Sequence, residues 1–335
     1  MTGKILNLSD IFGDVNRTVY HYTSPSTFEK IISNQELWFS RCDCLNDYED
    51  GELVKSFFPS CLNELQKSGD ISREYYAAIS DSDIDLTHFA FRTEKMIPLP
   101  SANSKEAQAF EFLGRTIECK PYVCCFSQSD DSLQMWQYYS KVGNYEGYNI
   151  GFSFKQILQI ENYLSRGRII YKEEQQKNSI KKVILHNYID YCANLKENGG
   201  IITDKNQYLR SRAVDLNSDL TKLSCFFKRE CFEGEKEVRL VLEVPTDSEY
   251  RDKLWMKQSD GKYPVPIKYT FKHAMMVPYV VVSFNPESVK SVMIGPITSA
   301  IDNSKKRNKE IVEEFLFDRL GRKIPVSTSR IPVRR

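Results

Sequence analysis

Two long helical stretches stand side by side in the second half of the sequence, and they restrict the possible folds more than any other feature. Residues 175–197 and 205–229 each repeat apolar side chains at the spacing of an amphipathic helix, and two glycines at 199–200 separate them. The apolar positions are Ile180, Val183, Ile184, Tyr188, Ile189, Cys192 and Leu195, then Leu209, Ala213, Leu216, Leu220, Leu223 and Phe227. Since strand-like segments flank the pair, we predict a helical insertion at 175–229 that packs against a sheet.

The rest of the chain predicts an α+β fold. Strands are predicted over 18–23, 37–40, 121–127, 148–153, 168–172, 237–244, 280–284, 291–294 and 323–327, and further helices over 25–34, 51–67, 131–139 and 306–320. The irregular order of helices and strands favours α+β over a doubly wound sheet. We expect residues 1–335 to form one elaborated domain, in which the irregular, acidic segment 69–105 is a surface insertion or lid.

Composition excludes several classes of protein. Hydrophobic residues make up 41% of the chain and charged residues 27%, which excludes disorder of the whole chain. The net charge of +1 argues against binding polyanions over the whole surface. The longest apolar run, 274–282, is far shorter than the ~20 residues of a membrane span, and no signal pattern opens the chain. We therefore expect a cytoplasmic protein that does not contact membranes.

The sequence also lacks the common nucleotide-binding and metal-binding patterns. Neither GxGxxG nor GxxxxGK[ST] occurs, so side chains would have to hold any nucleotide. The nine cysteines form no CxxC pair, and HExxH is missing. We expect buried, reduced thiols and no metal.

Two segments carry side chains that could hold a sugar and a flat ring. His21 and Thr23 share one face of the strand predicted over 18–23, and a histidine beside a hydroxyl can bind a ribose diol. Trp136, Tyr138 and Tyr139 could stack on a heterocycle. Ordinary structural roles, as a hydrogen-bonded histidine and core aromatics, are the alternatives.

A third segment places two acids and one base at alternating positions. Glu235, Glu237 and Arg239 would share one face of a strand, opposite the apolar Val238 and Leu240. Cleavage of an N-glycosidic bond passes through an oxocarbenium-like sugar cation, which a fixed carboxylate stabilises. The arginine could pair with a phosphate or hold the carboxylate in place. The alternative is a salt-bridge stripe on the protein surface.

These segments resemble a known family in their order along the chain. The runs YHYTS, FEKIISN, QELWFSRCDCLNDYEDGE, CCFSQSDDSLQMWQYYS, EGEKEVRL, VMIGP and IPVR, from Tyr20 to Arg334, are similar to the bacterial family of unknown function numbered 2971. The opening segment also resembles the start of the ADP-ribosyltransferase fold, as in DNA-modifying toxins, poly-ADP-ribose polymerases and RNA 2′-phosphotransferases. This resemblance implies a split sheet that is mixed or antiparallel.

The resemblance to the His-Tyr-Glu group of that fold implies a role for several residues. His21 would bind the ribose of NAD, Tyr139 or Tyr138 would pack on nicotinamide, and Glu237, with Glu235 as the alternative, would catalyse. The other predicted site residues are Arg239, beside the catalytic glutamates, and five residues that would contact the substrate: Tyr22, Thr23, Ser40, Arg41 and Trp136.

The implied function is an enzyme that uses NAD as its substrate. It would transfer ADP-ribose, without a metal, to a macromolecular acceptor, either nucleic acid or protein. Such an enzyme would be a bacterial toxin or antiphage defence effector with a neutralising or regulatory partner protein. Alternatives are an NAD glycohydrolase, a non-catalytic module that senses a nucleotide or binds a partner, and phosphate transfer from RNA ends, for which Arg41, Arg239 and Arg334 would have to converge.

Overall fold

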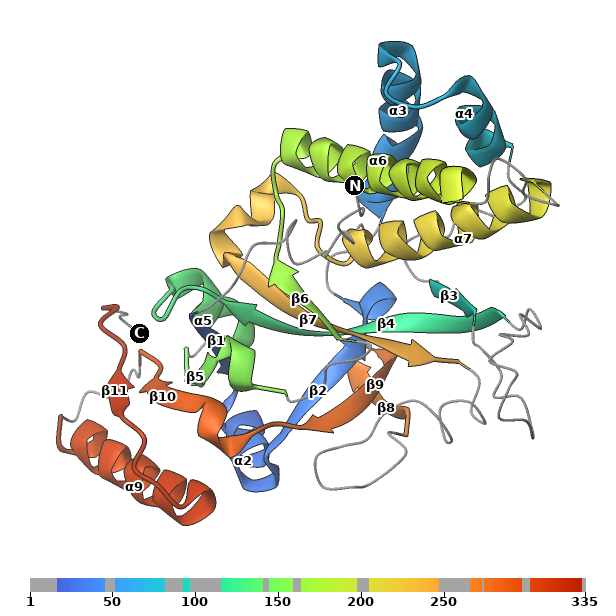
Figure 1. Cartoon of the computed structure of the whole chain (residues 1–335). Coiled ribbons are helices and arrows are strands. Elements are labelled where there is room, and N and C mark those ends of the chain that lie inside the picture. Colours follow the sequence, from blue (N-terminus) through green and yellow to red (C-terminus); the bar gives the residue numbers. More distant parts are fainter. Residues whose placement is uncertain are drawn as a thin grey trace, which may run out of the picture.

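The computed structural model describes residues 17–45, 52–81, 93–96, 116–140, 145–158, 164–197, 205–246, 266–272, 274–296 and 302–332. The strands are β1 (Thr18–Thr23), β2 (Glu36–Arg41), β3 (Thr93–Met96), β4 (Thr116–Ser127), β5 (Tyr148–Ser153), β6 (Leu164–Arg168), β7 (Glu237–Pro245), β8 (Lys268–Lys272), β9 (Met275–Ser283), β10 (Val289–Ile294) and β11 (Val326–Thr328). The α-helices are α2 (Pro25–Asn34), α3 (Glu52–Ser68), α4 (Arg73–Ser80), α5 (Leu133–Tyr139), α6 (Glu173–Glu197), α7 (Lys205–Ser224) and α9 (Asp302–Leu320). Figure 1 shows their arrangement.

These strands form one mixed sheet, organised around β4. Its main path runs β11-β10-β5-β1-β4-β2-β9-β8, and β10–β11 is the parallel pair among the strands named above. Strand β7 covers one edge of β4 from Cys119 to Ser127, and β6 follows β7. Strands β1, β2 and β3 therefore share the other edge of β4.

That shared edge is interrupted between β1 and β2. Strand β1 pairs with β4 at Ser127, whereas β2 pairs with it at Tyr122 and Val123. Among the described strands, neither reaches residues 124–126 of β4 on this side. The side chain of His21 enters the gap instead, with Nδ1 3.0 Å from the carbonyl oxygen of Cys125. The sheet is split at this point, and a side chain satisfies a carbonyl that the ladder leaves unpaired.

The two faces of the sheet pack against different helices. On β7, Val238, Leu240 and Leu242 join a core with residues of α2 and α9. Val241 points to the opposite face and joins a second cluster with residues of α3, α4, α6 and α7. This alternation follows the two-residue period of a strand and confirms the apolar face predicted for β7. Figure 1 shows the four helices gathered on one side of the sheet.

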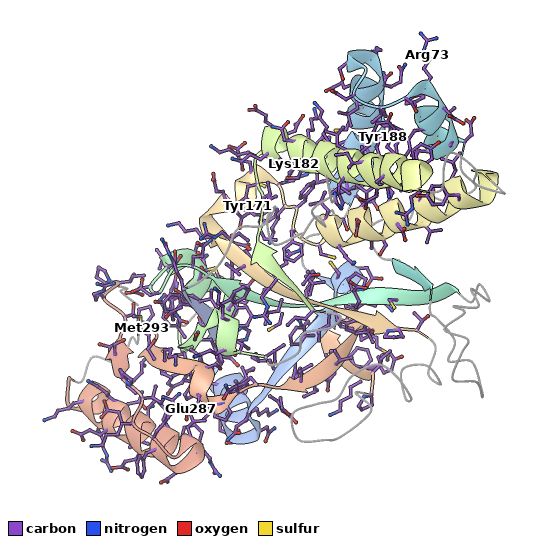
Figure 2. The ribbon with its side chains drawn as sticks, in the orientation of Figure 1. Arg73, Tyr171, Lys182, Tyr188, Glu287 and Met293 are labelled. Atoms are coloured by element: carbon purple, nitrogen blue, oxygen red, sulfur yellow. The ribbon has the colours of Figure 1, made fainter. Side chains whose placement is uncertain are left out.

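The two predicted long helices are present as α6 and α7. Ile184 of α6 and Leu220 of α7 lie in the same buried cluster as Val241 of the sheet. Tyr188 of α6 lies within this helical layer, with its ring centroid 5.0 Å from that of Tyr75 in α4 (Figure 2). The apolar repeat therefore identified both helices and most of the faces that they bury. Two predicted positions are wrong: Ile189 is 52% exposed, and Phe227 lies beyond α7, which ends at Ser224 and not at the predicted residue 229.

Other segments differ from the predictions. Residues 73–80, expected to be irregular, form α4, because Ser72 caps the helix by accepting from the Tyr75 amide at 3.1 Å and Tyr75 and Ile79 are buried one turn apart. Residues 82–92 and 97–105 of the expected insertion lie outside the described part. The strand predicted at 168–172 lies earlier, as β6, and β3 and β8 were not predicted. Within the described ranges, no helix has the length and apolar character required to cross a membrane.

Candidate functional site

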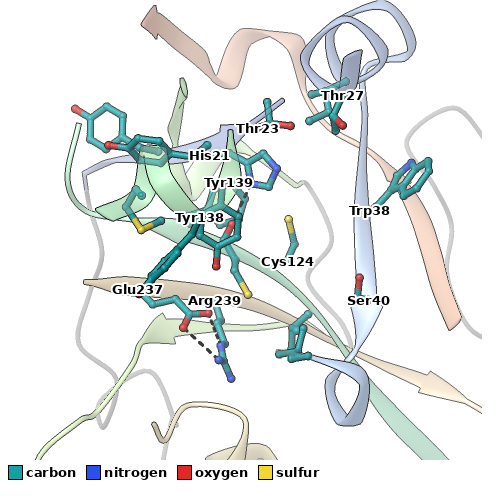
Figure 3. A pocket seen from close by; sticks show the side chains of 18 of the residues that line it. His21, Thr23, Thr27, Trp38, Ser40, Cys124, Tyr138, Tyr139, Glu237 and Arg239 are labelled. Atoms are coloured by element: carbon teal, nitrogen blue, oxygen red, sulfur yellow. Dashed lines mark hydrogen bonds and ion pairs between the residues drawn. The ribbon is translucent and has the colours of Figure 1, made fainter. Parts of the chain in front are cut away.

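A cavity of about 830 Å³ lies where the sheet splits. Its walls come from β1, α2, β2, β4, α5, the segment after α7, β7, β8 and β9. His21, Thr23, Ser40, Tyr139 and Glu237 all line it (Figure 3). The volume falls within the roughly 300–1,000 Å³ of typical small-molecule sites. Residues that are far apart in the sequence thus meet in one cavity.

One end of the cavity contains a buried network of ion pairs. We call it the carboxylate end, and it consists of Glu235, Glu237, Lys228 and Arg239. Arg239 donates from Nε to Oε1 of Glu237 at 2.7 Å and from Nη2 to Oε2 at 3.2 Å. The Lys228 ammonium donates to Glu235 at 2.8 Å and to Glu237 at 3.2 Å. Since Arg239 is 1% exposed and both glutamates 5%, the alternative of a surface salt-bridge stripe is wrong.

The charges of this network set the ionisation of its members. Burial by itself would raise the pKa of Glu237, but Arg239 and Lys228 outweigh it and lower the pKa to about 2. Burial dominates at Glu235 and raises its pKa. Burial also opposes the charge of Lys228, but the two carboxylates outweigh it, so its pKa lies above its usual value. Glu237 is therefore ionised at neutral pH.

A sharp turn brings the two glutamates together. Glu235 ends a 3₁₀ helix (Glu230–Glu235), Lys236 has a left-handed backbone with φ of 47°, and Glu237 begins β7. Ser127 donates to the Glu235 carbonyl at 2.7 Å, and the Gln128 amide donates to the Lys236 carbonyl at 3.0 Å. The prediction that both glutamates lie on one strand is wrong. They meet because the turn is fixed to the end of β4 and Lys228 bridges them.

His21 lies in the middle of the cavity wall as a neutral ring. Burial lowers its pKa, and the nearby charge of Lys272 acts in the same direction. Because the carbonyl of Cys125 can only accept, Nδ1 of His21 is the donor in their hydrogen bond. The Nε2 atom of a neutral ring is then an acceptor, available to a donor such as a sugar hydroxyl. Thr23 lines the cavity beside it, as predicted.

Both candidate tyrosines line the cavity from the last turn of α5. Tyr138 is 57% exposed and Tyr139 37%. Burial raises the pKa of the Tyr139 hydroxyl, and the neighbouring Cys125, Glu237 and Glu235 raise it further. Hydrogen bonding with the Cys125 thiol helps to lower the pKa of Glu237. Tyr139 is therefore the tyrosine whose hydroxyl approaches the carboxylates.

Three residues predicted to bind the substrate have structural roles. Trp136 is completely buried, does not line the cavity and donates from Nε1 to Asp131 at 2.8 Å. Tyr22 lines the cavity, but its ring packs edge-on against Trp136 at 4.7 Å and its hydroxyl donates to a backbone carbonyl at 2.8 Å. Arg41 pairs with Asp43 at 2.6 Å and does not reach the cavity. The proposed stacking by Trp136 is thus corrected to a core role.

The residues of the cavity wall that were not predicted to belong to the site include Lys228, Cys125, Trp38 and Lys272. A signal existed for Lys228, because it directly follows two phenylalanines that are fully buried, and a lysine in such a position needs a partner. A signal also existed for Trp38, which alternates with the buried Leu37 and Phe39 and must face away from the core.

Comparison with known proteins supports part of the resemblance. A family profile described as "Protein of unknown function (DUF2971)" matches residues 135–240, so this part of the chain is similar to that family. The matched part includes Lys228, Glu237 and Arg239, whereas His21 precedes it. No curated protein and no solved structure was found to match the chain.

The side chains of the described residues do not indicate a metal site. Throughout the ranges that the structure describes, no group of three or more His, Cys, Asp or Glu side chains is arranged to hold a metal ion. All nine cysteines are free, and only Cys231 is exposed.

Proposed function

We propose that this chain is an NAD-dependent ADP-ribosyltransferase that acts on a macromolecule. One observation carries the proposal: His21 of β1, Tyr139 of α5 and Glu237 of β7 line the same cavity. These are the three positions that the resemblance assigns to ribose binding, nicotinamide packing and catalysis. The split edge of β4 supports the finer proposal that the sheet has the ADP-ribosyltransferase fold, because the split opens the sheet beside His21.

The proposed reaction breaks the bond between C1′ of the ribose and the nicotinamide nitrogen. Nicotinamide leaves with the electron pair, and the ribose acquires oxocarbenium-like positive charge. Glu237, kept ionised by Arg239 and Lys228, stabilises that charge. A nucleophile of the acceptor then bonds to C1′ and releases its proton to solvent. The Nε2 atom of His21 would accept a hydrogen bond from a ribose hydroxyl, and Tyr139 would pack on the nicotinamide ring.

The acceptor and the biological setting rest on the resemblance alone. A nucleic acid or a protein would receive the ADP-ribose, and the chain would act as a bacterial toxin or antiphage effector. The resemblance also implies a partner protein that neutralises or regulates the enzyme.

Incubation with labelled NAD, cellular nucleic acid and lysate tests the proposal. We expect release of nicotinamide and transfer of label to a macromolecule, and a loss of roughly 10²–10³-fold in rate for Glu237→Gln. Glu243→Gln is the matched control, since Glu243 is equally buried on the same face of β7, pairs with Lys222 at 3.5 Å and does not line the cavity. Nicotinamide release without label transfer would indicate glycohydrolysis. Absence of both would reject the proposal.

One observation favours a second candidate, a non-catalytic nucleotide sensor. Both carboxylate oxygens of Glu237 already accept hydrogen bonds from cations, so a developing sugar cation would have to compete with Arg239 and Lys228. If Glu237→Gln keeps both NAD binding and the cellular effect while His21→Ala loses both, sensing replaces catalysis as the conclusion.

A further inference from the structure

The end of the cavity opposite the carboxylates has a different chemistry. We call it the lysine end, and it consists of Trp38, Lys30, Lys268 and Lys272. Figure 3 shows Trp38 across the cavity from Glu237, with His21 and Cys124 between them. The hydroxyls of Thr27 and Ser40 also line this end.

Trp38 presents an open aromatic face. Its indole stacks on the ring of Tyr279, with centroids 4.3 Å apart and an interplanar angle of 21°. Stacking covers one face of the indole, yet Trp38 remains 47% exposed and lines the cavity. A tryptophan held rigid by one ring and open on the other side is a platform on which a flat ring can stack.

The neighbouring lysines are not neutralised. Within the described part of the chain, none of Lys30, Lys268 and Lys272 makes an ion pair. The Lys272 ammonium donates to Oγ of Ser40 at 3.4 Å, and its charge lowers the pKa of His21. Lys272 is therefore directed from β8 toward the middle of the cavity, where an anion could accept a hydrogen bond from its ammonium group.

Lysines on an edge strand often serve only to prevent sheets from aggregating. That explanation requires side chains that project away from the sheet into solvent. Lys268 and Lys272 instead line the cavity, together with residues of β2 and β9. The exposed aromatic residues Tyr269 and Phe271 alternate with them on the same strand and do not line it. Strand β8 thus places its two lysines at the cavity and its exposed aromatic rings outside it.

We infer that the lysine end is a binding subsite for a nucleoside phosphate. The base stacks on the open face of Trp38, and the phosphate pairs with Lys272 and Lys268. The ribose then faces Ser40 and Thr27, whose hydroxyls can exchange hydrogen bonds with it.

The same nucleotide unit could have two sources. It is either the adenosine phosphate half of a free dinucleotide or one nucleotide of an acceptor strand. We place the remainder of the ligand past His21, toward Glu237. This placement rests on the proposed function. The stacking and the phosphate contact do not depend on it.

Isothermal titration of the full chain with ADP, inorganic pyrophosphate and a short oligodeoxythymidine tests the inference. We expect Trp38→Ala to weaken nucleotide binding about tenfold and leave pyrophosphate binding unchanged. Lys272→Ala should weaken binding of both about tenfold. Trp38→Phe should retain most of the affinity, and unchanged pyrophosphate binding by Trp38→Ala excludes misfolding as the cause. Phe271→Ala is the matched control, because Phe271 is 69% exposed on the same strand but outside the cavity.

The outcomes separate the sources and the two proposals. Binding of ADP in preference to the oligonucleotide assigns the subsite to a free dinucleotide, and the reverse preference assigns it to an acceptor strand. If neither nucleotide binds, or if Phe271→Ala weakens binding as much as Trp38→Ala, the subsite is refuted even if NAD is consumed. Binding that depends on Trp38 without NAD turnover would refute the proposed reaction alone.

Discussion

At the carboxylate end of the cavity each charge lies beside an opposite charge, whereas at the lysine end three ammonium groups have no ion-pair partner among the described residues. The first set is buried beneath the helical layer. The second set is exposed, with Lys268 and Lys272 on the edge strand β8 and Lys30 on α2. The same residue types therefore meet very different dielectric environments within one cavity.

The difference follows from the cost of removing charge from water. A buried charge without a partner costs several kcal/mol, so Glu237 and Arg239 had to be paired for the sheet to fold. An exposed lysine has little such cost and can remain without a partner until a ligand binds. We conclude that the carboxylate end is fixed by folding, and that the lysine end is free to respond to what binds.

The largest expected effect comes from breaking the buried network. Arg239→Met should lower the free energy of unfolding by ~3–5 kcal/mol, because Glu237 would remain buried without its principal partner. Lys272→Met at the lysine end should change it by less than ~1 kcal/mol. Urea denaturation of the three proteins measures both. Equal losses would remove the distinction between the two ends.

A double variant tests whether the unpaired charge of Glu237 causes the loss of stability in Arg239→Met. Glu237→Gln combined with Arg239→Met removes both members of the pair, and it should recover part of the stability that Arg239→Met loses. If the double variant is less stable than Arg239→Met, packing of the guanidinium and not its charge supports this part of β7.

Acid should distinguish the two glutamates. The pKa of Glu237 falls from 4.5 to about 2 on folding, so its contribution to stability is complete above pH 4.5 and disappears as the pH falls toward 2. This contribution amounts to roughly 3 kcal/mol. The pKa of Glu235 is raised, so its protonation favours the folded state as the pH falls.

The unfolding free energy measured between pH 6 and 2 checks this opposition. Glu237→Gln should make the decline toward acid shallower, and Glu235→Gln should make it steeper. If both substitutions shift the curve in the same direction, the two carboxyl groups do not differ in ionisation as the geometry requires.

His21, between the two ends, should show an intermediate effect. His21→Ala leaves the carbonyl of Cys125 without its hydrogen bond, which should cost ~1–3 kcal/mol in the free energy of unfolding. His21→Asn retains a donor at the position of Nδ1 and should lose less. Denaturation curves of the two variants provide the comparison. If His21→Asn is no more stable than His21→Ala, this hydrogen bond does not stabilise the gap between β1 and β2 along β4.

The sequence predicted those parts of the molecule that depend on local patterns. Alternation identified β1 and the apolar face of β7, and helical spacing identified α6 and α7. Strand β3 escaped prediction because it is very short. Strand β8 does alternate polar residues with the aromatic Tyr269 and Phe271, but this strand-like signal was not used in the prediction. The omission of β8 also concealed Lys268 and Lys272.

The sequence could predict only those parts of the candidate site in which the chemistry of a single side chain indicates its role. His21, Tyr139 and Glu237 were chosen by residue type and order, and they line one cavity. Trp136 was misassigned because spacing along α5 does not reveal which of its aromatic residues the fold buries. The role of Lys228 depends on the turn at Lys236, which no short-range pattern predicts.

The smallest expected effect concerns the two turns that set the ends of the cavity. Lys236 precedes β7 with φ of 47°, and Ala274 precedes β9 with φ of 66°, both in the left-handed region. Glycine relieves ~1–2 kcal/mol of steric cost there, but its greater freedom in the unfolded chain cancels ~0.5–1 kcal/mol. Lys236→Gly and Ala274→Gly should therefore raise the unfolding free energy by at most about 1.5 kcal/mol. Lys290→Gly, at an exposed position of β10, should lower it instead. Thermal melts compare the three, and a loss at Lys236 as large as that at Lys290 would mean that the turn holding the carboxylate end depends on the Lys236 side chain itself.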